Sequence, residues 1–324
     1  MNFLLKRAIT YLVVFFVVLN LTFILPRLVP GNAAELLASG TRVPASAAVA
    51  IAARFGLGQP IYVQYVSFLK NIFFTWPPWL GVSYGYFPAT VTSLFMGRIG
   101  WSLGLILSSF LFGFLLIYFL GAKSLLKRKS KVETGSLYAS IMFNSVPLFW
   151  VSMVLLFAFA IHFKIFPLFG STGFSSSGGL SYVSSVIWHA VLPITVLSLS
   201  IMAEGFLILR GSAQDILRSN YILAAKTRGL SDWTISTGYL LRNSLLPLVS
   251  ILSFSMASLI SRVVLVEVVF GYPGVGDLLV DAVLGRDYPV IEGSFFYLTI
   301  LVVIGGLIGD VALMRLDPRL RINR

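Results

Sequence analysis

The pentapeptide Gly81–Gly85 reads G-V-S-Y-G, which matches the G-x-S-x-G pattern around the nucleophilic serine of many hydrolases. A working nucleophile elbow needs a strand before the serine and a helix after it, with a histidine and an acid alongside. Here Ser83 follows the turn-rich tract Trp76–Trp79 and lies outside every long apolar stretch. An intramembrane serine protease is therefore disfavoured, also because neither histidine lies in the last apolar stretch.

The sequence has few residues that could bind a metal or carry out redox chemistry. The only histidines, His162 and His189, belong to no H-E-x-x-H pattern, so packing or interfacial hydrogen bonding is the favoured interpretation. The chain has no cysteine, which excludes disulfides, thiolate zinc sites and iron–sulfur clusters. No metal ligand and no catalytic residue is predicted.

A nucleotide site is also missing from the sequence. The glycines Gly271, Gly274 and Gly276 are followed by no lysine of a phosphate-binding loop, so a turn is favoured there. No G-x-x-x-x-G-K-[ST] motif occurs anywhere in the chain. The chain therefore cannot bind and hydrolyse ATP by that route.

The elements that must position these residues are apolar. Of 324 residues, 57% are hydrophobic and only 11% are charged, with a mean hydropathy of +0.91. Soluble proteins carry roughly 25% charged residues, so the surrounding medium is lipid. The net charge of +12 comes from short basic runs between apolar stretches, which indicates membrane orientation and excludes nucleic acid as a partner.

Six stretches are long enough to cross the bilayer, because about 20 helical residues span about 30 Å. They run from Ala8 to Leu25, Gly100 to Leu120, Leu137 to Ile161, Trp188 to Leu209, Leu245 to Val269 and Ser294 to Leu313. The sequence predicts an all-α integral membrane protein with six transmembrane helices. Residues 1–28 form the N-terminus and first span, 29–99 an external segment, and 100–324 the core.

Basic residues alternate between the loops and set the orientation. Sixteen of the 24 fall on one side: Lys6, Arg7, Lys123, Lys127, Arg128, Lys129, Lys131, Arg210, Arg218, Lys226, Arg228, Arg242, Arg315, Arg319, Arg321 and Arg324. This side is predicted to be cytoplasmic, which places both termini there in a plasma-membrane protein. In the external segment, Ile61–Phe74 has the pattern of an amphipathic helix, and the aromatic residues after it suit the headgroup zone.

The cytoplasmic loop 211–244 is the longest polar segment inside the core. Ser219 and Asn220 can start a short helix, Tyr221 to Arg228 continues it, and Gly229 can end it as a left-handed cap. Such a helix is too short to be stable alone and must pack on something. Its exposed basic residues, Lys226 and Arg228, are compatible with an anionic lipid surface or with a protein partner.

Besides Asp310, three charged residues lie within the apparent spans: Glu204, Arg262 and Glu267. Glu204 is expected near the cytoplasmic end of the fourth span, and Arg262 near the outer surface in the fifth. Arg262 and Glu267 are five residues apart and form no obvious pair on one helix. All three are candidates to face a pore or a partner, with lipid snorkelling as the alternative for Arg262.

The cytoplasmic loop resembles the EAA loop of ABC importer permeases, in the form found in the dipeptide, oligopeptide and nickel group. The resemblance covers nearly the whole chain and rests on residues that include Leu28, Pro30, Gly31, Gln59, Pro60, Pro147, Trp150, Pro193, Ala224, Ala225, Gly229, Leu246, Pro247, Gly271, Pro273, Gly274, Gly276, Arg286, Asp287, Asp310, Asp317, Pro318 and Arg319. Two departures are clear. Leu223 replaces the acid that names the loop, and Glu204 and Arg262 occupy spans that are mostly uncharged in the family.

The resemblance implies a non-catalytic subunit of an ATP-driven importer. Its expected partners are a homologous second permease, two cytoplasmic ATPase subunits that hold ATP and Mg, and an external substrate-binding protein. The expected ATPase-coupling residues are Tyr221, Ala224, Ala225, Lys226, Arg228, Gly229 and Leu230. Family cargoes include peptides, oligosaccharides and nickel, and the sequence does not choose between them. A membrane receptor or scaffold that moves nothing is the alternative from another class.

Overall fold

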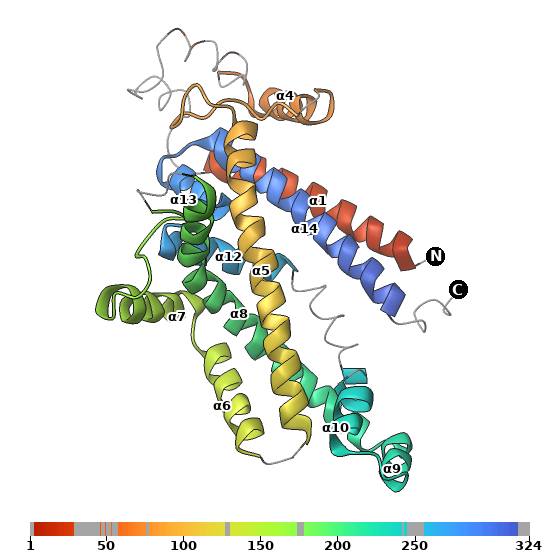
Figure 1. Ribbon diagram of the computed structural model, residues 1–324. Helices are drawn as coiled ribbons and strands as arrows, with labels where there is room; N and C mark the ends of the chain where they lie inside the picture. Colours follow the sequence, from red (N-terminus) through yellow and green to blue (C-terminus); the bar gives the residue numbers. More distant parts are fainter. Residues whose placement is uncertain are drawn as a thin grey trace. The chain divides into compact units, whose positions relative to one another are not determined.

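The computed structural model describes residues 3–28, 46, 49, 53, 58–75, 78–126, 130–173, 178–241, 243–244 and 256–316. The chain forms two compact units (Figure 1). The first contains Met1–Phe3, Trp101–Pro273 and Gly305–Arg324, and the second contains Leu4–Gly100 and Gly274–Ile304. The expected residues Pro30, Gly31, Leu246, Pro247, Asp317, Pro318 and Arg319 lie outside the described part.

Helices account for the regular structure of the described residues. In chain order they are α1 (Phe3–Leu28), α4 (Ile61–Phe73), α5 (Val91–Leu126), α6 (Lys131–Ser145), α7 (Leu148–Leu155), the π-type turns η1 (Leu156–His162), α8 (Gly179–Leu217), α9 (Asn220–Thr227), α10 (Asp232–Thr234), the π-type turns η2 (Ile235–Leu241), α12 (Met256–Phe270), α13 (Val275–Leu284) and α14 (Tyr288–Leu316). Over the same residues, extended pairing is limited to one bridge between Val82 and Thr90. The all-α prediction is confirmed.

Four helices are long and apolar enough to cross a membrane without a break: Arg7–Leu25, Val91–Ser124, Gly179–Leu217 and Tyr288–Arg315. They contain the first, second, fourth and sixth predicted spans. With 36 and 39 residues, α5 and α8 are about 54 and 58 Å long, so each extends well beyond the hydrocarbon layer. Two bent helix pairs bring the number of spans to six if each pair counts as one.

The third predicted span, Leu137 to Ile161, is not one helix. The segments Lys131–Ser145 and Leu148–His162 meet at an angle of 107°. Pro147 lacks the N–H that a continuous helix would need, and it favours an extended conformation for the preceding residue. Val146 accordingly has φ −97° and ψ 131°. The sequence prediction followed hydropathy and missed this break.

The fifth predicted span, Leu245 to Val269, is also different. Residues 245–255 lie outside the described part, and Ser258–Phe270 meets Val275–Leu284 at 73°. The turn between α12 and α13 contains Gly271, whose φ of +53° suits a residue without a side chain. This confirms the predicted turn at the glycine tract. The apolar path continues through α13, beyond the predicted end.

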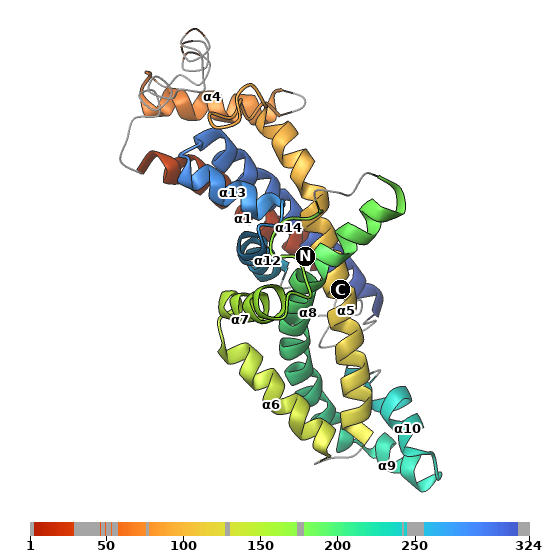
Figure 2. The ribbon, with the colours of Figure 1, turned by 60° about the vertical axis from the view of Figure 1, so that its left-hand side comes forward.

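The first unit is built around α8. Its buried side chains include Val196, Leu197, Phe206 and Leu209, and α6 runs along α8 in both views (Figures 1 and 2). α5 approaches α8 closely at Gly113, where an added Cβ would lie 2.8 Å from Ile201 Cγ2 and 3.2 Å from the Ser198 carbonyl oxygen. The glycine therefore allows two long helices to touch.

The second unit has its own core. Side chains from α1, α4, α13, the first parts of α5 and α14, and the segment between α4 and α5 meet there: Leu19, Ile72, Leu80, Val91, Leu278, Ala282, Val290 and Phe296. The predicted amphipathic helix of the external segment is confirmed as α4, with Phe68 and Leu69 directed toward this core. Tyr65 on α4 donates a hydrogen bond to Asn20 of α1 at 2.7 Å. α4 is thus fixed to α1.

We expect Gly113→Leu to lower the stability of the folded protein by about 1–3 kcal/mol, the usual cost of overpacking a filled contact. Gly104→Leu, on the same helix, is the matched control, because an added Cβ at Gly104 meets no atom within 4 Å. Thermal unfolding of the two purified variants in the same detergent measures the difference. Equal melting temperatures would show that α5 and α8 do not depend on this contact.

Candidate functional site

The short helix predicted in the cytoplasmic loop is present as α9. Ser219 precedes it with φ −76° and ψ 147°, the usual conformation of an N-cap. Its hydroxyl does not cap the helix but donates to the carbonyl of Ile216 at 2.6 Å, which closes the turn after α8. The chain therefore leaves α8 and enters α9 through a fixed turn.

Gly229 ends α9 as predicted, with φ +71°. The amide of Leu230 donates to the Ala225 carbonyl at 3.4 Å, and the amide of Gly229 donates to the Lys226 carbonyl at 3.0 Å. These two bonds form a Schellman motif, which needs a left-handed residue where glycine stands.

One face of α9 packs on its own chain. Ile222 and Ala225 are buried beside Ile235 and Leu240 of η2. Ile216, Leu217, Leu230 and Tyr239 surround this cluster. A helix of eight residues has little stability of its own, so these contacts hold it in place. Ala225, which we expected to contact an ATPase, is covered by its own chain and is only 3% exposed.

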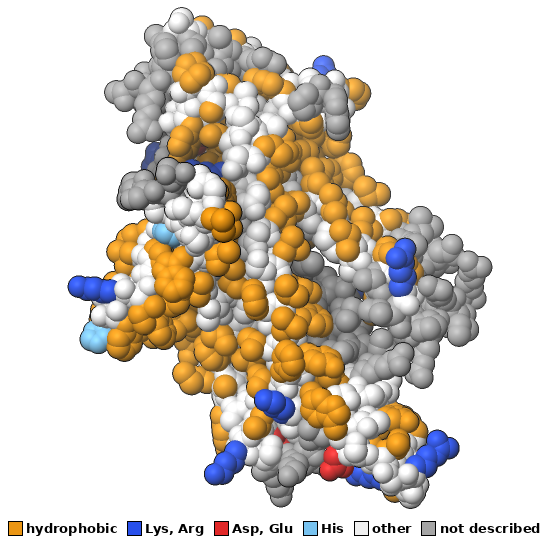
Figure 3. All heavy atoms as spheres, in the orientation of Figure 1, with side chains coloured by type: hydrophobic (Ala, Val, Ile, Leu, Met, Phe, Trp, Pro, Cys, Tyr) orange, Lys and Arg blue, Asp and Glu red, His pale blue; other side chains and the backbone are white. Residues whose placement is uncertain are grey.

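The opposite face is exposed and carries both apolar and basic side chains. It comprises Tyr221, Leu223, Ala224, Lys226 and Arg228, followed by Trp233 of α10. Leu223 is 64% exposed and Trp233 is 55% exposed. Figure 3 shows hydrophobic and basic side chains together at this lower end, where Figure 1 places α9 and α10. We call these six residues the coupling surface; the sequence analysis missed Trp233, although a tryptophan in a polar loop is an available signal.

η2 connects α9 to the long helices. The Ser236 hydroxyl donates to the Ala122 carbonyl of α5 at 3.1 Å. Leu241 is fully buried in a cluster with Ile117 of α5 and Leu209 of α8. A displacement of α9 would therefore reach both helices through packed side chains.

Arg262 and Glu204 form an ion pair that the sequence did not reveal. Arg262 Nη2 lies 2.8 Å from Glu204 Oε2, and Arg262 Nη1 donates to the Ser200 hydroxyl at 3.2 Å. The two residues were expected at opposite ends of their spans. That expectation was wrong, because the contact places both side chains at one level, and α8 continues to Leu217, beyond the predicted end of its span at Leu209.

Glu267 does not share this environment. Its side chain has no exposed surface, whereas those of Arg262 and Glu204 are 28% and 26% exposed. Five residues correspond to a rotation of about 140° around a helix, so Glu267 lies on the inner side of α12. The expectation that Glu267 faces a pore or partner is not supported.

A charge at the bilayer centre costs about 2.5–3.5 kcal/mol on insertion scales. Pairing reduces this cost, and the pair joins α8 to α12 through residues 58 positions apart. Arg262 therefore has a protein partner, which replaces lipid snorkelling as its role. The pair remains partly uncovered by its own chain.

The G-x-S-x-G match is a structural turn in the second unit. Ser83 is buried, and its hydroxyl donates to Asp287, which also accepts the amide of Gly85 at 2.9 Å. The Ser83 oxygen accepts the amide of Tyr86 at 2.8 Å. Burial raises the pKa of the Tyr84 phenol well above its usual range, and the Glu292 and Asp287 carboxylates raise the same pKa further. This serine fixes a loop and is not placed as a nucleophile.

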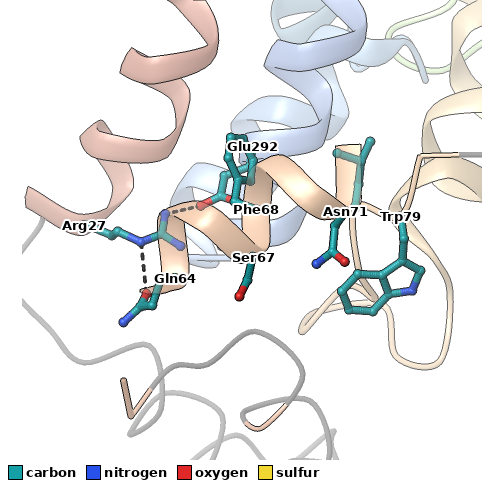
Figure 4. Close-up of a pocket in the computed structure, with 8 residues that line it drawn as sticks. Arg27, Gln64, Ser67, Phe68, Asn71, Trp79 and Glu292 are labelled. Atoms are coloured by element: carbon teal, nitrogen blue, oxygen red, sulfur yellow. Dashed lines mark hydrogen bonds and ion pairs between the residues drawn. The ribbon is translucent and has the colours of Figure 1, made fainter. Parts of the chain in front are cut away.

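A small polar cavity adjoins a second ion pair in the same unit (Figure 4). Arg27 of α1 contacts Glu292 of α14 and donates from Nε to Gln64 of α4 at 3.3 Å. The cavity volume is about 10 Å³, which holds roughly one water molecule. The contacts of Arg27 hold α1, α4 and α14 together, and the cavity beside them has no room for a solute.

The two histidines lie in different surroundings: His162 is exposed, and His189 is partly buried. His189 Nδ1 lies 2.7 Å from the Ser185 carbonyl oxygen, and the ring of His162 contacts Phe163 edge-on. Among the described residues, no group of three His, Asp or Glu side chains is arranged to hold a metal ion.

The sequence of the chain matches two families of known proteins. Residues 111–322 match the family described as "Binding-protein-dependent transport system inner membrane component". Residues 1–85 match the N-terminal family described as "Binding-prot-dependent transport system membrane comp, N-term". Together the two matches reach from the first helix to the end of the core.

Relatives match this chain over nearly their whole length. The chain is 29% identical to the di/tripeptide transport system permease protein DppB of Pseudomonas aeruginosa, with 100% of both chains covered. It is 28% identical to the oligopeptide transport system permease protein AppB of Bacillus subtilis, with 98% of each covered. Identity to the dipeptide transport system permease protein DppB of Escherichia coli is 24%, with 99% of each covered.

We expect Asp287→Ala to release the turn around Ser83, because the buried hydroxyl and the Gly85 amide lose their acceptor. Each lost bond to a charged group costs about 1.5–3 kcal/mol. Chymotrypsin cleavage after Tyr84 and Tyr86 in the purified protein should then be faster. Asp281→Ala is the control, since that carboxylate accepts only from the exposed Tyr86 hydroxyl among the bonds found here. Equal cleavage in both variants would contradict the anchoring role.

Proposed function

Because the chain belongs to the family of binding-protein-dependent transport system inner membrane components, we propose that it forms half of the pore of an ATP-driven peptide importer. As a member of this family it is a multi-pass inner-membrane permease subunit, not the enzyme that powers the transport. The other half of the pore is a homologous second permease. Cargo crosses by alternating access, in which the two halves open first to one side and then to the other.

Short peptides are the proposed cargo. The support is the names of the full-length relatives, which are di/tripeptide, oligopeptide and dipeptide transport permeases. Oligosaccharides and nickel, the other cargoes considered, have no such support among these relatives. An external substrate-binding protein would deliver the peptide to the outer side.

ATP hydrolysis is proposed to occur in two cytoplasmic ATPase subunits. This chain has no phosphate-binding loop in its sequence, so ATP and Mg would be held by those partners. The positive-inside pattern of the loops supports a cytoplasmic position for α9 and for both termini. The driving force must then enter this chain by contact.

The coupling surface is the proposed point of entry, and its geometry is the observation that carries the proposal. Tyr221 and Leu223 expose apolar side chains on α9, whose other face is packed, and Trp233 is exposed on α10, which contributes no buried residue. An exposed apolar patch flanked by basic groups is typical of a protein interface. When the ATPases close, α9 would move as a rigid body, and η2 would carry the motion to α5 and α8.

The residues predicted for coupling divide into two roles. Tyr221, Ala224, Lys226 and Arg228 would contact the partner, whereas Ala225, Gly229 and Leu230 would hold α9 in shape. Ile222 and the η2 residues share the second role. A bulky acid at Ala225 would therefore disturb the fold of the loop, and only changes on the exposed face test docking.

A receptor or scaffold that moves nothing is the alternative. The anchored α9 argues against it, since a scaffold that binds outside needs no exposed cytoplasmic helix joined to the pore helices. The two hypotheses differ in one measurement. Uptake of labelled dipeptide into vesicles that contain the complete complex requires ATP only if this chain belongs to an importer.

We expect Leu223→Asp to reduce ATP-dependent dipeptide uptake tenfold or more, because about 1.4 kcal/mol of lost contact changes binding tenfold. Co-purification of the ATPase subunits should fall with it. Val132→Asp is the control: Val132 lies on α6, also on the predicted cytoplasmic side, and is 42% exposed. If the two variants transport equally well at equal abundance, the coupling surface lies elsewhere.

A further inference from the structure

The Arg262–Glu204 pair lies at membrane depth. Glu204 stands six residues, about 9 Å, before Arg210, and the residues around it from Ile201 to Leu209 are apolar or glycine. Arg262 stands eight residues, about 12 Å, before the end of α12 at Phe270. Their contact at 2.8 Å places both charges at one level, inside the apolar part of each helix.

A polar strip surrounds the pair. On α12, Ser258 and Ser261 are exposed to one side of Arg262, while Val263 and Val266 are buried to its other side. On α8, Ser200 accepts a hydrogen bond from Arg262. We call Ser200, Glu204, Ser258, Ser261 and Arg262 the polar strip. Among the described residues of the first unit, a second ion pair, Arg210 with Glu133, joins the start of α6 to α8.

Lipid is a poor neighbour for this strip. Charged and hydroxyl groups at membrane depth face a protein interior or a water-filled cavity. The chain's own residues leave about a quarter of each charged side chain uncovered. In a permease that is half of a pore, the water-filled path supplies a polar environment for these charged and hydroxyl groups.

We propose that the polar strip lines the translocation path and that its ion pair binds the two charged ends of a peptide. Arg262 takes the carboxylate, which its planar guanidinium can bind through two parallel hydrogen bonds. Glu204 takes the terminal ammonium. The inference rests on the proposed peptide importer and adds a binding site for unmodified peptide termini.

The exchange conserves charge. In the empty path the two side chains neutralise each other, so neither is left as an isolated charge. A peptide residue spans about 3.3–3.6 Å, so the ends of even a dipeptide lie farther apart than the paired atoms. The peptide must therefore separate the pair, and two new ion pairs replace the one that breaks. After release the original pair re-forms.

A brace between α8 and α12 would use the same contact without touching cargo. The two roles differ in their response to the chemistry of the peptide ends. Loss of a brace weakens the protein for every peptide equally. Loss of one binding partner weakens recognition of one terminus and spares the other.

Because the chain has no cysteine, a thiol introduced at the polar strip is the only one in this chain that a reagent can label. Ser261→Cys introduces a single thiol on the strip, in the complex with its partner subunits in nanodiscs. A charged, water-soluble thiol reagent should modify this chain. Leu111→Cys on α5 is the control, with 58% of the side chain exposed on an apolar helix. It should react at least tenfold more slowly.

Protection by peptides then tests recognition. Trialanine, N-acetyl-trialanine and trialanine amide are compared without the external binding protein, so that only the path selects among them. We expect trialanine to protect the thiol introduced by Ser261→Cys at least fivefold better than either blocked peptide. With Glu204→Gln, blocking the amino end should no longer matter. With Arg262→Gln, blocking the carboxyl end should no longer matter, and Arg262→Lys should restore part of that preference.

Each outcome decides the matter. Two results overturn the proposal if the complex stays intact and ATP-dependent uptake continues. In the first, the introduced thiol stays unmodified. In the second, it is modified but all three peptides protect it equally. Dissociation of the two permeases by Arg262→Lys assigns the strip to their interface and also overturns it. If the unaltered complex shows no ATP-dependent uptake of any peptide, it is the importer itself that fails.

Discussion

Burial of Ile222 and Ala225 against Ile235 and Leu240 is the contact on which the coupling surface depends. Eight residues cannot hold a helix in water, so α9 has a fixed shape only while this face stays covered. Because η2 lies beneath it and bonds to α5, the same contact that shapes α9 also connects it to the long helices. The packing that holds α9 in shape is therefore continuous with the packing of η2 on α5.

Charge is handled differently at the places where the chain carries it. In the described part of the chain, arginines meet carboxylates of distant elements in the pairs Arg27 with Glu292, Arg98 with Asp277, Arg210 with Glu133 and Arg262 with Glu204. The first two tie together parts of the second unit, and the third joins α8 to the start of α6. The last joins two apolar helices, and its side chains are about as exposed as those of Arg98 and Asp277. Its position between apolar helices, rather than its exposure, sets it apart.

Proline and glycine decide where helices stop, touch or turn. Pro147 breaks the third span, and Gly271 allows the turn between α12 and α13. Gly113 lets α5 and α8 approach to a distance that any side chain would prevent. These residues carry no chemistry, yet they place the helices from which the polar strip and the coupling surface are built.

The sequence by itself determined the apolar helices, the sites of the short cytoplasmic helix and of α4, and the turn at Gly229, because these depend on local composition and backbone preference. It did not determine which face of α9 is exposed, why Ser83 is buried, or that Arg262 meets Glu204. Those features depend on residues far apart in the chain, and hydropathy did not place Arg262 and Glu204 at the level at which they meet. Only the tertiary structure brings such residues together, since hydropathy records how apolar a segment is but not what it packs against.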